Sequence, residues 1–390
     1  MLRDYTDAGG NSADTARAAR ADDPITLFDG LMRQPAEAPA FRTAAGLLTF
    51  GSVRRQAGAL AVYLNENGVG PGDRVLVRGA THPRTAVAVY AVLMAGASYL
   101  AVDGNADIAT IHEINLRAAT TTVIGDDEDD IEKVTSSPVM WSLNFRTFLD
   151  GLQDNLCDVL SVYPVPPDQP ALVVFSSHAE QAPRGVAISH AALASNMLAL
   201  ARHMSIGTED RLLGPTVITD HAGAFELFVP LLVGCSTILA STADDVPTLR
   251  RCDDAQTSPC ANVQRQSGAH TLQSSSEVSR AHLALLGLLM PEMGYVPLVR
   301  AAADEPWRLV DGVHADLADD GTMHFDGAGV ALGYVNEEAA TAQAFVAREQ
   351  DGRRVFRSEL RVRRAVDGAI AALCVPSPMV TVGWMREDVK

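Results

Sequence analysis

A short polar stretch, SSHAEQAPRG at residues 176–185, holds the side chains best suited to chemistry. It places two serines beside a histidine, between the apolar segments ALVVF and VAIS. A hydroxyl next to an imidazole is the pair of groups that nucleophilic acyl transfer uses, so Ser176 or Ser177 with His178 is a candidate for catalysis. The residues alone therefore leave an acyl-transfer enzyme as one hypothesis.

Two clusters of charge are further candidates for ligand binding. The acidic run DDEDD at residues 126–130 could hold a cation, but adjacent acids point in different directions, so we favour a solvated loop. Arginines near the end of the chain could bind a phosphate or a carboxylate, although a solvated edge strand explains them equally well. They are Arg353, Arg354, Arg357, Arg361, Arg363 and Arg364.

Helices and strands alternate along the first half of the chain. Residues 53–67 have helical periodicity, 68–72 form a turn, and 74–78 form a short apolar strand. Residues 85–102 carry no charge over a length that raises the question of a membrane span. Their Ala- and Val-rich composition, interrupted by Gly96, favours a buried helix followed by a buried strand. This alternation predicts an α/β fold with a largely parallel sheet.

The second half of the chain changes in character. The α/β pattern continues through a helix that begins near His190 and another over residues 225–232. Residues 242–280 have weak periodicity, which predicts an irregular segment rich in loops. Beyond Pro306 the Gly-, Val- and Arg-rich text predicts short strands and a β-rich remainder.

Composition excludes several classes of function. Among the 390 residues, 48 acids against 31 basic residues give a formal charge of -17, which argues against a nucleic-acid partner. The 5 cysteines contain no C-x-x-C pair, so neither a disulfide framework nor a zinc site is expected, and a reducing cytoplasm is the expected compartment. Residues 1–23 lack the apolar segment of a secretory signal and are expected to be a flexible leader.

Two blocks of sequence carry a resemblance to a known family. The first is LTFGSVRRQAGALAVYLNENGVGPGDRVLV with AVYAVLMAGASYLAVD, and the second is GAGVALGYVNEEAATAQAFV at residues 327–346. Both resemble the adenylate-forming superfamily, which includes acyl-CoA synthetases, luciferases and the adenylation domains of nonribosomal peptide synthetases. The resemblance implies the large N-terminal domain of that fold, with stacked mixed and parallel sheets, flanking helices and a smaller β-rich part.

The resemblance also implies a division of the chain. The expected parts are a leader at 1–23, an α/β core at 24–241, an irregular shortened segment at 242–280 and a β-rich remainder at 281–390 that ends near the hinge. The family's catalytic lysine belongs to a small C-terminal lid domain. Only Lys133 and Lys390 are lysines here, so we expect that lid to be absent from this chain.

The family's chemistry joins a carboxylate to the α-phosphate of ATP with Mg²⁺ and then passes the acyl group to a thiol or amine. Its phosphate loop matches residues 176–185, which assigns Ser176, Ser177, His178 and Arg184 to the nucleotide site. His178 and Gln181 replace loop glycines, which removes freedom to turn backbone N–H groups toward phosphate, and Glu180 adds a negative charge. Arg184 keeps the positive charge of the family's lysine as a planar fork.

The remaining assignments are also carried over from the family. Glu277, after three serines, matches the glutamate that helps to hold magnesium, although a helix cap explains the same text. The ribose-binding acid matches Leu360, or Glu359 if one residue is deleted. Asp220 and His221 match positions that line the substrate pocket, and Asp220 as a helix cap is the alternative.

These assignments favour a pseudoenzyme: a non-catalytic or impaired adenylation-like protein that binds a partner protein or a small carboxylic acid in a biosynthetic pathway. The resemblance implies a carrier protein or a synthetase as the partner. Neither a nucleic acid nor a membrane is expected to be a partner. No cofactor is expected unless activity is retained, in which case ATP or AMP and Mg²⁺ would bind. The alternatives are an active carboxylate-AMP ligase with an altered phosphate loop, and the acyl-transfer enzyme described above.

Overall fold

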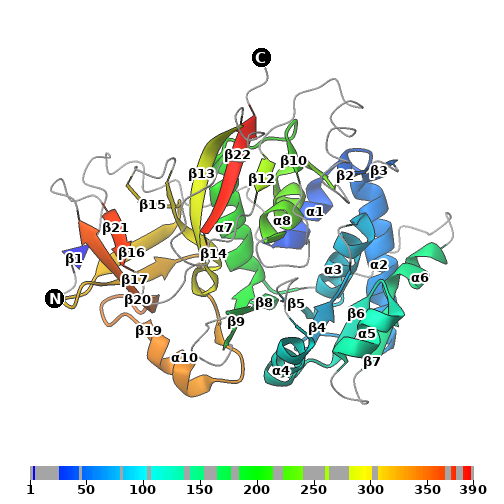
Figure 1. Ribbon diagram of the computed structural model, residues 1–390, viewed down its shortest axis with the longest axis horizontal. Coiled ribbons are helices and arrows are strands. Elements are labelled where there is room, and N and C mark those ends of the chain that lie inside the picture. The colour runs from blue at the N-terminus through cyan, green and yellow to red at the C-terminus, as the bar shows by residue number, and fades with distance from the viewer. Residues whose placement is uncertain are drawn as a thin grey trace.

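The structure is a computed structural model, shown in Figure 1, and its described residues form three β-sheets with helices packed on them. It describes residues 3–4, 26–43, 46–79, 82–102, 107–135, 141–152, 165–176, 184–213, 223–239, 260–262, 281–300, 306–364, 370–374 and 381–387. Every structural statement below concerns these residues.

The predicted phosphate loop connects two neighbouring strands of a sheet of seven strands. Its order is β18-β9-β8-β5-β4-β6-β7, and β8, β5, β4, β6 and β7 run parallel while β9 and β18 are antiparallel to their neighbours. The strands are β4 (Arg74–Val77), β5 (Ser98–Ala101), β6 (Thr122–Gly125), β7 (Trp141–Asn144), β8 (Pro170–Ser176), β9 (Arg184–Ser189) and β18 (Gly333–Tyr334). The buried runs in β5 and β6 are typical of strands covered on both faces.

A second sheet of nine strands joins segments from both halves of the chain, in the order β15-β14-β13-β22-β12-β10-β11-β2-β3. Its strands are β2 (Pro39–Thr43), β3 (Gly46–Thr49), β10 (Arg211–Leu213), β11 (Ser236–Ile238), β12 (Cys260–Asn262), β13 (Ala281–Met290), β14 (Tyr295–Arg300), β15 (Arg308–Leu309) and β22 (Thr381–Glu387). The β12 strand is the described part of the segment 242–280 that the sequence predicts to be irregular.

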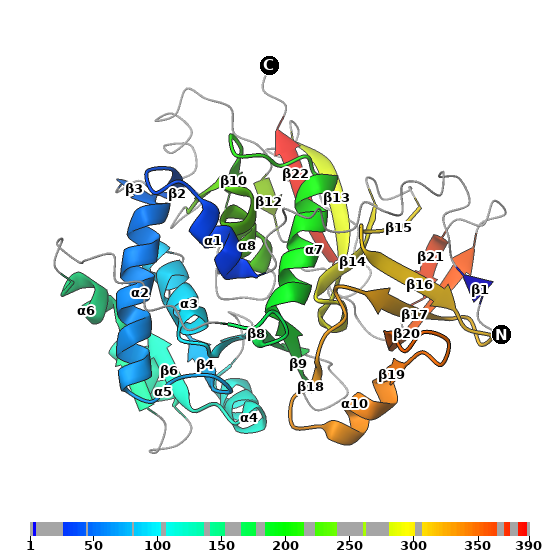
Figure 2. The same ribbon diagram turned by 180° about the vertical axis from the view of Figure 1, so that it is seen from behind.

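The helices bury one another and the faces of these two sheets. Helix α7 contacts strands of both sheets, α3 packs on β4 and β5, α8 packs on β11, and α2 packs on α3, β2 and β3 (Figure 2). Helices α4 and α5 form a separate apolar cluster with β4, β5 and β6. The helices are α1 (Leu27–Arg33), α2 (Phe50–Glu66), α3 (Pro83–Met94), α4 (Ile108–Ala118), α5 (Glu128–Val134), α6 (Phe145–Asp150), α7 (His190–His203) and α8 (Ala224–Val233).

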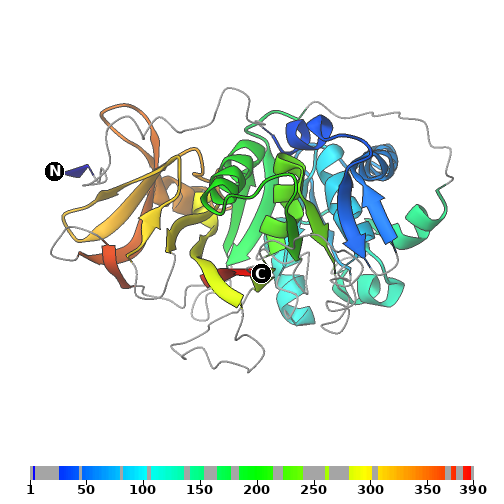
Figure 3. The same ribbon diagram turned by 90° about the horizontal axis from the view of Figure 1, so that it is seen from above.

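The smaller third sheet makes up most of the β-rich part and lies on the side of the molecule away from α2 and α6, as the view from above shows (Figure 3). Its order is β1-β16-β17-β20-β19, with β21 paired to β20. Its members are β1 (Arg3–Asp4), β16 (Val313–Leu317), β17 (Thr322–Gly327), β19 (Phe345–Ala347), β20 (Arg354–Arg364) and β21 (Ile370–Cys374), accompanied by the helix α10 (Glu338–Ala344) and the short 3-10 helix η3 (Pro291–Met293).

The elements predicted from periodicity are confirmed where the structure describes them. Helix α2 spans the predicted helix 53–67 except for its last residue, Asn67, which is the C-cap, and it begins at an N-cap, Thr49, whose side chain accepts a hydrogen bond from the N–H of Ser52. The uncharged segment 85–102 is helix α3 followed by β5, and α3 is buried on every side. None of the helices in the described ranges is both long and apolar enough to cross a membrane.

Two predictions about charged segments are corrected by the structure. The acidic run 126–130 is exposed at its centre and half-buried at Asp126 and Asp130, but it is not a loop, because Asp127 caps α5 and the next acids form its first turn, where negative charge is favourable. The arginine-rich strand β20 is not an edge strand, since β17 pairs with one side of it and β19 and β21 with the other. Exposed arginines such as Arg357 alternate there with buried residues such as Phe356.

Candidate functional site

The predicted phosphate loop connects two paired strands of the seven-stranded sheet. Ser176 is the last residue of β8 and lies opposite Arg184, the first residue of β9. Ser177 and His178 belong to the segment 177–183, which lies outside the described residues. The structure therefore gives the two ends of the loop, and the assignment of Ser176, Ser177 and His178 to a site stays a prediction.

A close contact at the second end of the loop explains why a glycine follows Arg184. Phe175 lies opposite Gly185 in the β8–β9 pair. A Cβ atom added to Gly185 would come within 2.7 Å of the Phe175 ring. Only glycine leaves room for this ring, so the contact holds the Arg184 backbone against β8.

Arg184 pairs with an acid that comes from the far end of the sequence. Its Nε lies 3.0 Å from Oε2 of Glu337, and its guanidinium carbon lies 5.1 Å from the centre of the Tyr334 ring. The Tyr334 hydroxyl in turn donates a hydrogen bond of 3.4 Å to Oε1 of Glu292. Burial, with Glu292 nearby, raises the pKa of Tyr334 well above its ordinary value of 10.0. The positive charge of Arg184 thus meets a carboxylate directly and a second one through a tyrosine.

The backbone that carries Glu337 is held firmly against β9. Strand β18 pairs with β9, with Tyr334 opposite Val186, and the N–H of Val335 donates to the carbonyl of Gly185 at 2.7 Å. Asn336 takes a left-handed conformation with φ 58°. This turn brings the chain round so that Glu337 starts helix α10 beside Arg184.

The two candidates for the ribose-binding acid lie on opposite faces of β20. Leu360 is 3% exposed and belongs to the main hydrophobic core. Glu359 is exposed on the other face of the strand. A leucine side chain cannot accept the hydrogen bonds of two ribose hydroxyls. The direct match therefore puts a buried apolar residue where the resemblance expects an acid, and the match with one residue deleted puts an exposed acid there.

The other predicted residues cannot be compared with a described site. Glu277, predicted for magnesium, and the substrate residues Asp220 and His221 lie outside the described residues. Helix α8 begins at Ala224 with Gly223 as its N-cap, and the alternative in which Asp220 is a helix cap stays a prediction. Within the part of the chain that the structure describes, no group of three His, Cys, Asp or Glu side chains could hold a metal ion.

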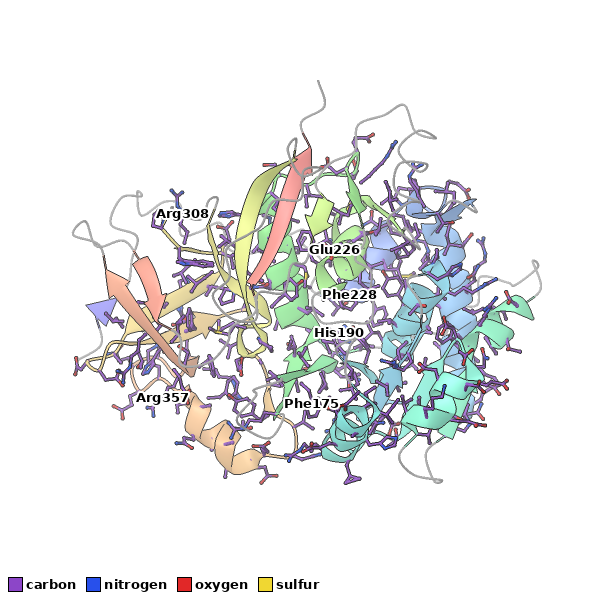
Figure 4. All side chains as sticks on the ribbon, viewed as in Figure 1. Phe175, His190, Glu226, Phe228, Arg308 and Arg357 are labelled. Atoms are coloured by element: carbon purple, nitrogen blue, oxygen red, sulfur yellow. The ribbon has the colours of Figure 1, made fainter. Side chains whose placement is uncertain are left out.

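Two buried titratable residues, His190 and Glu226, stand out in the α/β part (Figure 4). His190 begins α7, its ring centre lies 5.3 Å from that of Phe28, and burial lowers its pKa to about 4. Glu226 is fully buried in α8, and burial raises its pKa to about 8. Neither side chain has a hydrogen-bond partner among the described residues. Both groups are therefore uncharged at neutral pH.

Comparison with known families agrees with this architecture. The family model described as AMP-binding enzyme matches residues 28–261, which is more than half of the chain.

The chain belongs to the AMP-binding enzyme family.

Relatives of this AMP-binding chain are much longer synthetases. It is 25% identical over 411 residues to a probable non-canonical nonribosomal peptide synthetase, CymA, of Salinispora arenicola, with 94% of this chain and 5% of that protein covered. It is 24% identical over 392 residues to pyochelin synthetase PchF of Pseudomonas aeruginosa, with 86% and 21% covered. The chain thus spans a small fraction of the relatives that it matches.

Solved structures give the same fold. The N-terminal subdomain of NpsA from Klebsiella oxytoca superposes with a TM-score of 0.69 at 20% identity, covering 89% of this chain and 98% of that one. The nonribosomal peptide synthetase FmoA3 in its α-methyl-L-serine-AMP bound form gives a TM-score of 0.68 at 19% identity, with 92% and 46% covered. The predicted α/β fold, the large N-terminal part of an adenylation domain, is therefore confirmed.

Adenylation domains of this family use ATP and Mg²⁺, and the described residues of this AMP-binding chain do not fit that ligand well. Leu360 supplies no acceptor for ribose, and Arg184, the first residue of β9, already meets a carboxylate.

Sequence reasoning missed Glu337 and Tyr334 as members of the site. Both lie within the block GAGVALGYVNEEAATAQAFV that carries the family resemblance. Two adjacent glutamates follow Tyr334 closely in this block, so the sequence shows negative charge there. It did not show that the first of them, Glu337, pairs with Arg184. That contact depends on the pairing of β18 with β9.

Proposed function

We propose that this chain is an adenylation-domain-like protein with impaired or no adenylate-forming activity, which serves nonribosomal peptide synthesis by binding a partner protein or a small carboxylic acid. The observation that carries the proposal is the burial of Leu360 where the family resemblance expects the ribose-binding acid. An adenylate-forming site must hold ribose as well as phosphate to align the α-phosphate with the attacking carboxylate. Loss of that acid removes one of the groups that position the nucleotide.

The state of Arg184 supports the same proposal. Catalysis of phosphate chemistry needs a positive charge aimed at the oxygens where negative charge develops. The guanidinium here is paired at 3.0 Å with Glu337 and stacked on Tyr334. A nucleotide would have to displace the carboxylate, so binding and transition-state stabilisation are both weakened.

A carrier protein or a neighbouring synthetase module is the partner that we propose. The relatives at 24% and 25% identity are synthetases, of which the chain matches a small part. Proteins of that kind pass acyl groups between modules. An adenylation-like chain that forms no adenylate would then act by binding those modules.

The test is ATP–pyrophosphate exchange with a panel of amino acids, aryl acids and hydroxy acids, beside a working adenylation domain as positive control. We expect exchange at the background level with every acid. Acid-dependent exchange would refute impairment and establish the ligase instead. Binding of purified carrier proteins and synthetase modules, measured by calorimetry, tests the partner half of the proposal.

The acyl-transfer alternative makes a different prediction. A reactive Ser176 or Ser177 would be labelled covalently by a fluorophosphonate probe, and substitution of His178 would abolish the labelling. Under our proposal the native protein is not labelled at these serines, which intact-mass analysis measures directly.

A further inference from the structure

We propose that helices α4 and α5 form a docking surface for a basic, amphipathic helix of a partner protein. This α4–α5 face comprises the exposed side chains of the two helices and of their N-caps, Asp107 and Asp127. Its role rests on the proposed function, which already requires a partner protein, and adds the surface and the chemistry of the segment that fits it. Both helices lie at the lower edge of the molecule in Figure 1.

Leu116 is an apolar side chain that the fold of this chain does not use. Helix α4 packs on the sheet through Ile111, Ile114 and Ala118, which are buried in a cluster with residues of β4, β5 and β6. Leu116 lies two residues from both Ile114 and Ala118. Two residues turn an α-helix by about 200°, so the Leu116 side chain points away from that cluster. It is 75% exposed, which is more than any other large apolar side chain of the described residues.

A second exposed apolar side chain lies on the same side of α4. Ile108 is 39% exposed and lies eight residues before Leu116, and positions four and eight apart follow one side of a helix. A rise of about 1.5 Å per residue places the two side chains about 12 Å apart along the helix axis. A single exposed leucine is common on protein surfaces. Two apolar side chains at this spacing match the anchors of a second helix packed along the first.

Helix α5 lies directly beside this apolar side of α4. His112, four residues from each of the two apolar residues, donates from Nε2 a hydrogen bond of 2.8 Å to the carbonyl of Lys133. Asn115 donates from Nδ2 to the carbonyl of Val134 at 2.8 Å. Both carbonyls belong to the last residues of α5. The surface of α5 therefore adjoins the exposed apolar residues of α4.

The charges around these apolar residues are mostly negative. Glu128, Asp129 and Glu132 are exposed on α5 and form no ion pair with any residue that the structure describes. Over the two helices and their N-caps, the acids are Asp107, Glu113, Asp127, Glu128, Asp129, Asp130 and Glu132, and the basic residues are Arg117 and Lys133. A segment that carries lysines or arginines beside its apolar residues therefore complements this surface in charge.

The same charges argue against a second copy of this chain as the occupant. A symmetric dimer would place one α4–α5 face against another. The acids of both copies would then lie close together, and like charges oppose association. The chain as a whole carries a formal charge of -17, so a basic partner is also attracted from a distance. We therefore expect a different protein, with a positively charged helix, on this face.

The experiment uses the whole chain and a fluorescein-labelled model peptide. The peptide has leucines at helical spacing and lysines at its other positions. Two control peptides carry the same residues in scrambled order, or glutamates in place of the lysines. Fluorescence anisotropy measures the dissociation constants of the wild type, of Leu116→Ser and of the matched control Leu47→Ser, since Leu47 is 52% exposed on β3. We expect Leu116→Ser to weaken binding about five- to tenfold and Leu47→Ser by less than twofold.

A second pair of variants tests the charge of the α4–α5 face. The double variant Glu128→Gln/Glu132→Gln removes two of its acids, and Glu209→Gln/Glu349→Gln removes two exposed acids outside α4 and α5. We expect the first to weaken binding of the lysine peptide about two- to fivefold and to reduce its salt dependence, and the second to leave both unchanged. Equal melting temperatures show that each variant is folded, and Leu116→Ala provides a second substitution with the same expected loss.

The position of the bound peptide is measured by cross-linking. A lysine peptide with benzoylphenylalanine in place of its central leucine should attach to residues of α4 and α5, as peptide mass spectrometry will show. Cross-links elsewhere, equal affinities of Leu116→Ser and Leu47→Ser, or no preference for the lysine peptide over its two controls would each overturn the inference. A dimer that Leu116→Ser dissociates, measured by analytical ultracentrifugation, would overturn it as well, because the face then binds a second copy.

The outcomes of this test are separate from those of the proposed function. A failure of the peptide to bind leaves impaired adenylation intact, and another surface would then bind the partner. Acid-dependent pyrophosphate exchange by the wild type would refute impairment, while the comparison of Leu116→Ser with Leu47→Ser would still decide whether the α4–α5 face binds a basic helix.

Discussion

Substitution of Glu226 by glutamine should remove a strong pH dependence of the stability of this protein. Glu226 lies in α8, is 0% exposed, and neither of its carboxylate oxygens has a hydrogen-bond partner among the described residues. Burial raises the pKa of its carboxyl from 4.5 to about 8, because removal from water disfavours the charged form. The folded protein therefore keeps this carboxyl protonated at pH values where the unfolded chain has released the proton.

The size of the effect follows from proton linkage. Between pH 4.5 and about 8 the folded state binds one proton more than the unfolded state at this residue, so the free energy of unfolding falls as the pH rises. The slope approaches 1.4 kcal/mol per pH unit, which gives a loss of about 3 to 4 kcal/mol between pH 5 and pH 8 as an upper limit. Against a typical total stability of about 5 to 15 kcal/mol, this is a large fraction.

Urea unfolding of the wild type and of Glu226→Gln at pH 5, 6, 7 and 8 measures this difference. A glutamine has the same shape but does not titrate, so any cost of its unpaired amide is the same at every pH. The variant should gain stability relative to the wild type steadily as the pH rises. Glu209→Gln, at an exposed position, is the matched control and should show no such trend. A difference between Glu226→Gln and wild type that stays constant from pH 5 to pH 8 would refute the reasoning.

Three further predictions concern other buried groups. His190, whose pKa burial lowers from 6.5 to about 4, should make the protein lose up to about 3 kcal/mol of stability as the pH falls from 6.5 to 4, and urea titrations of His190→Gln should lack that loss. Leu360→Asp should lower the free energy of unfolding by about 3 kcal/mol or more, because it buries an unpaired charge, without restoring nucleotide binding by calorimetry. The Cys235 thiol, whose pKa burial raises, should stay unmodified by iodoacetamide in the native protein and react after unfolding, as peptide mass spectrometry will show.

Elements defined by local pattern could be predicted from the sequence. The helical period of residues 53–67 and the uncharged segment 85–102 each specify their structure through neighbours in the chain, and the structure bears out both. The arginine-rich strand was predicted less well. Its alternation of arginines with apolar residues indicates a strand with one buried face, but whether that strand lies at an edge depends on β19 and β21, which pair with it from other parts of the chain.

In the candidate site, too, local structure could be predicted and a contact between distant segments could not. The sequence places Arg184 in the polar loop just before the strand VAIS, and in the structure Arg184 is already the first residue of β9. The partner of Arg184 could not be predicted, because Glu337 reaches it only through a two-residue strand, β18, that joins the edge of the seven-stranded sheet. Such short non-local pairings leave almost no periodic signal in a sequence.

The choice between Leu360 and Glu359 shows how the structure can decide an alignment that the sequence leaves open. Successive side chains of a strand point to opposite faces, so a shift of β20 by one residue would exchange its two faces completely. Glu359 could take the place of Leu360 only if Phe356 and Leu360 turned toward solvent while Arg357 and Arg361 entered the core. Burying two arginines and exposing two large apolar side chains would cost far more than two ribose hydrogen bonds return. A role of Glu359 in binding ribose therefore requires the ligand to lie on the exposed face of β20, opposite to the face that buries Leu360.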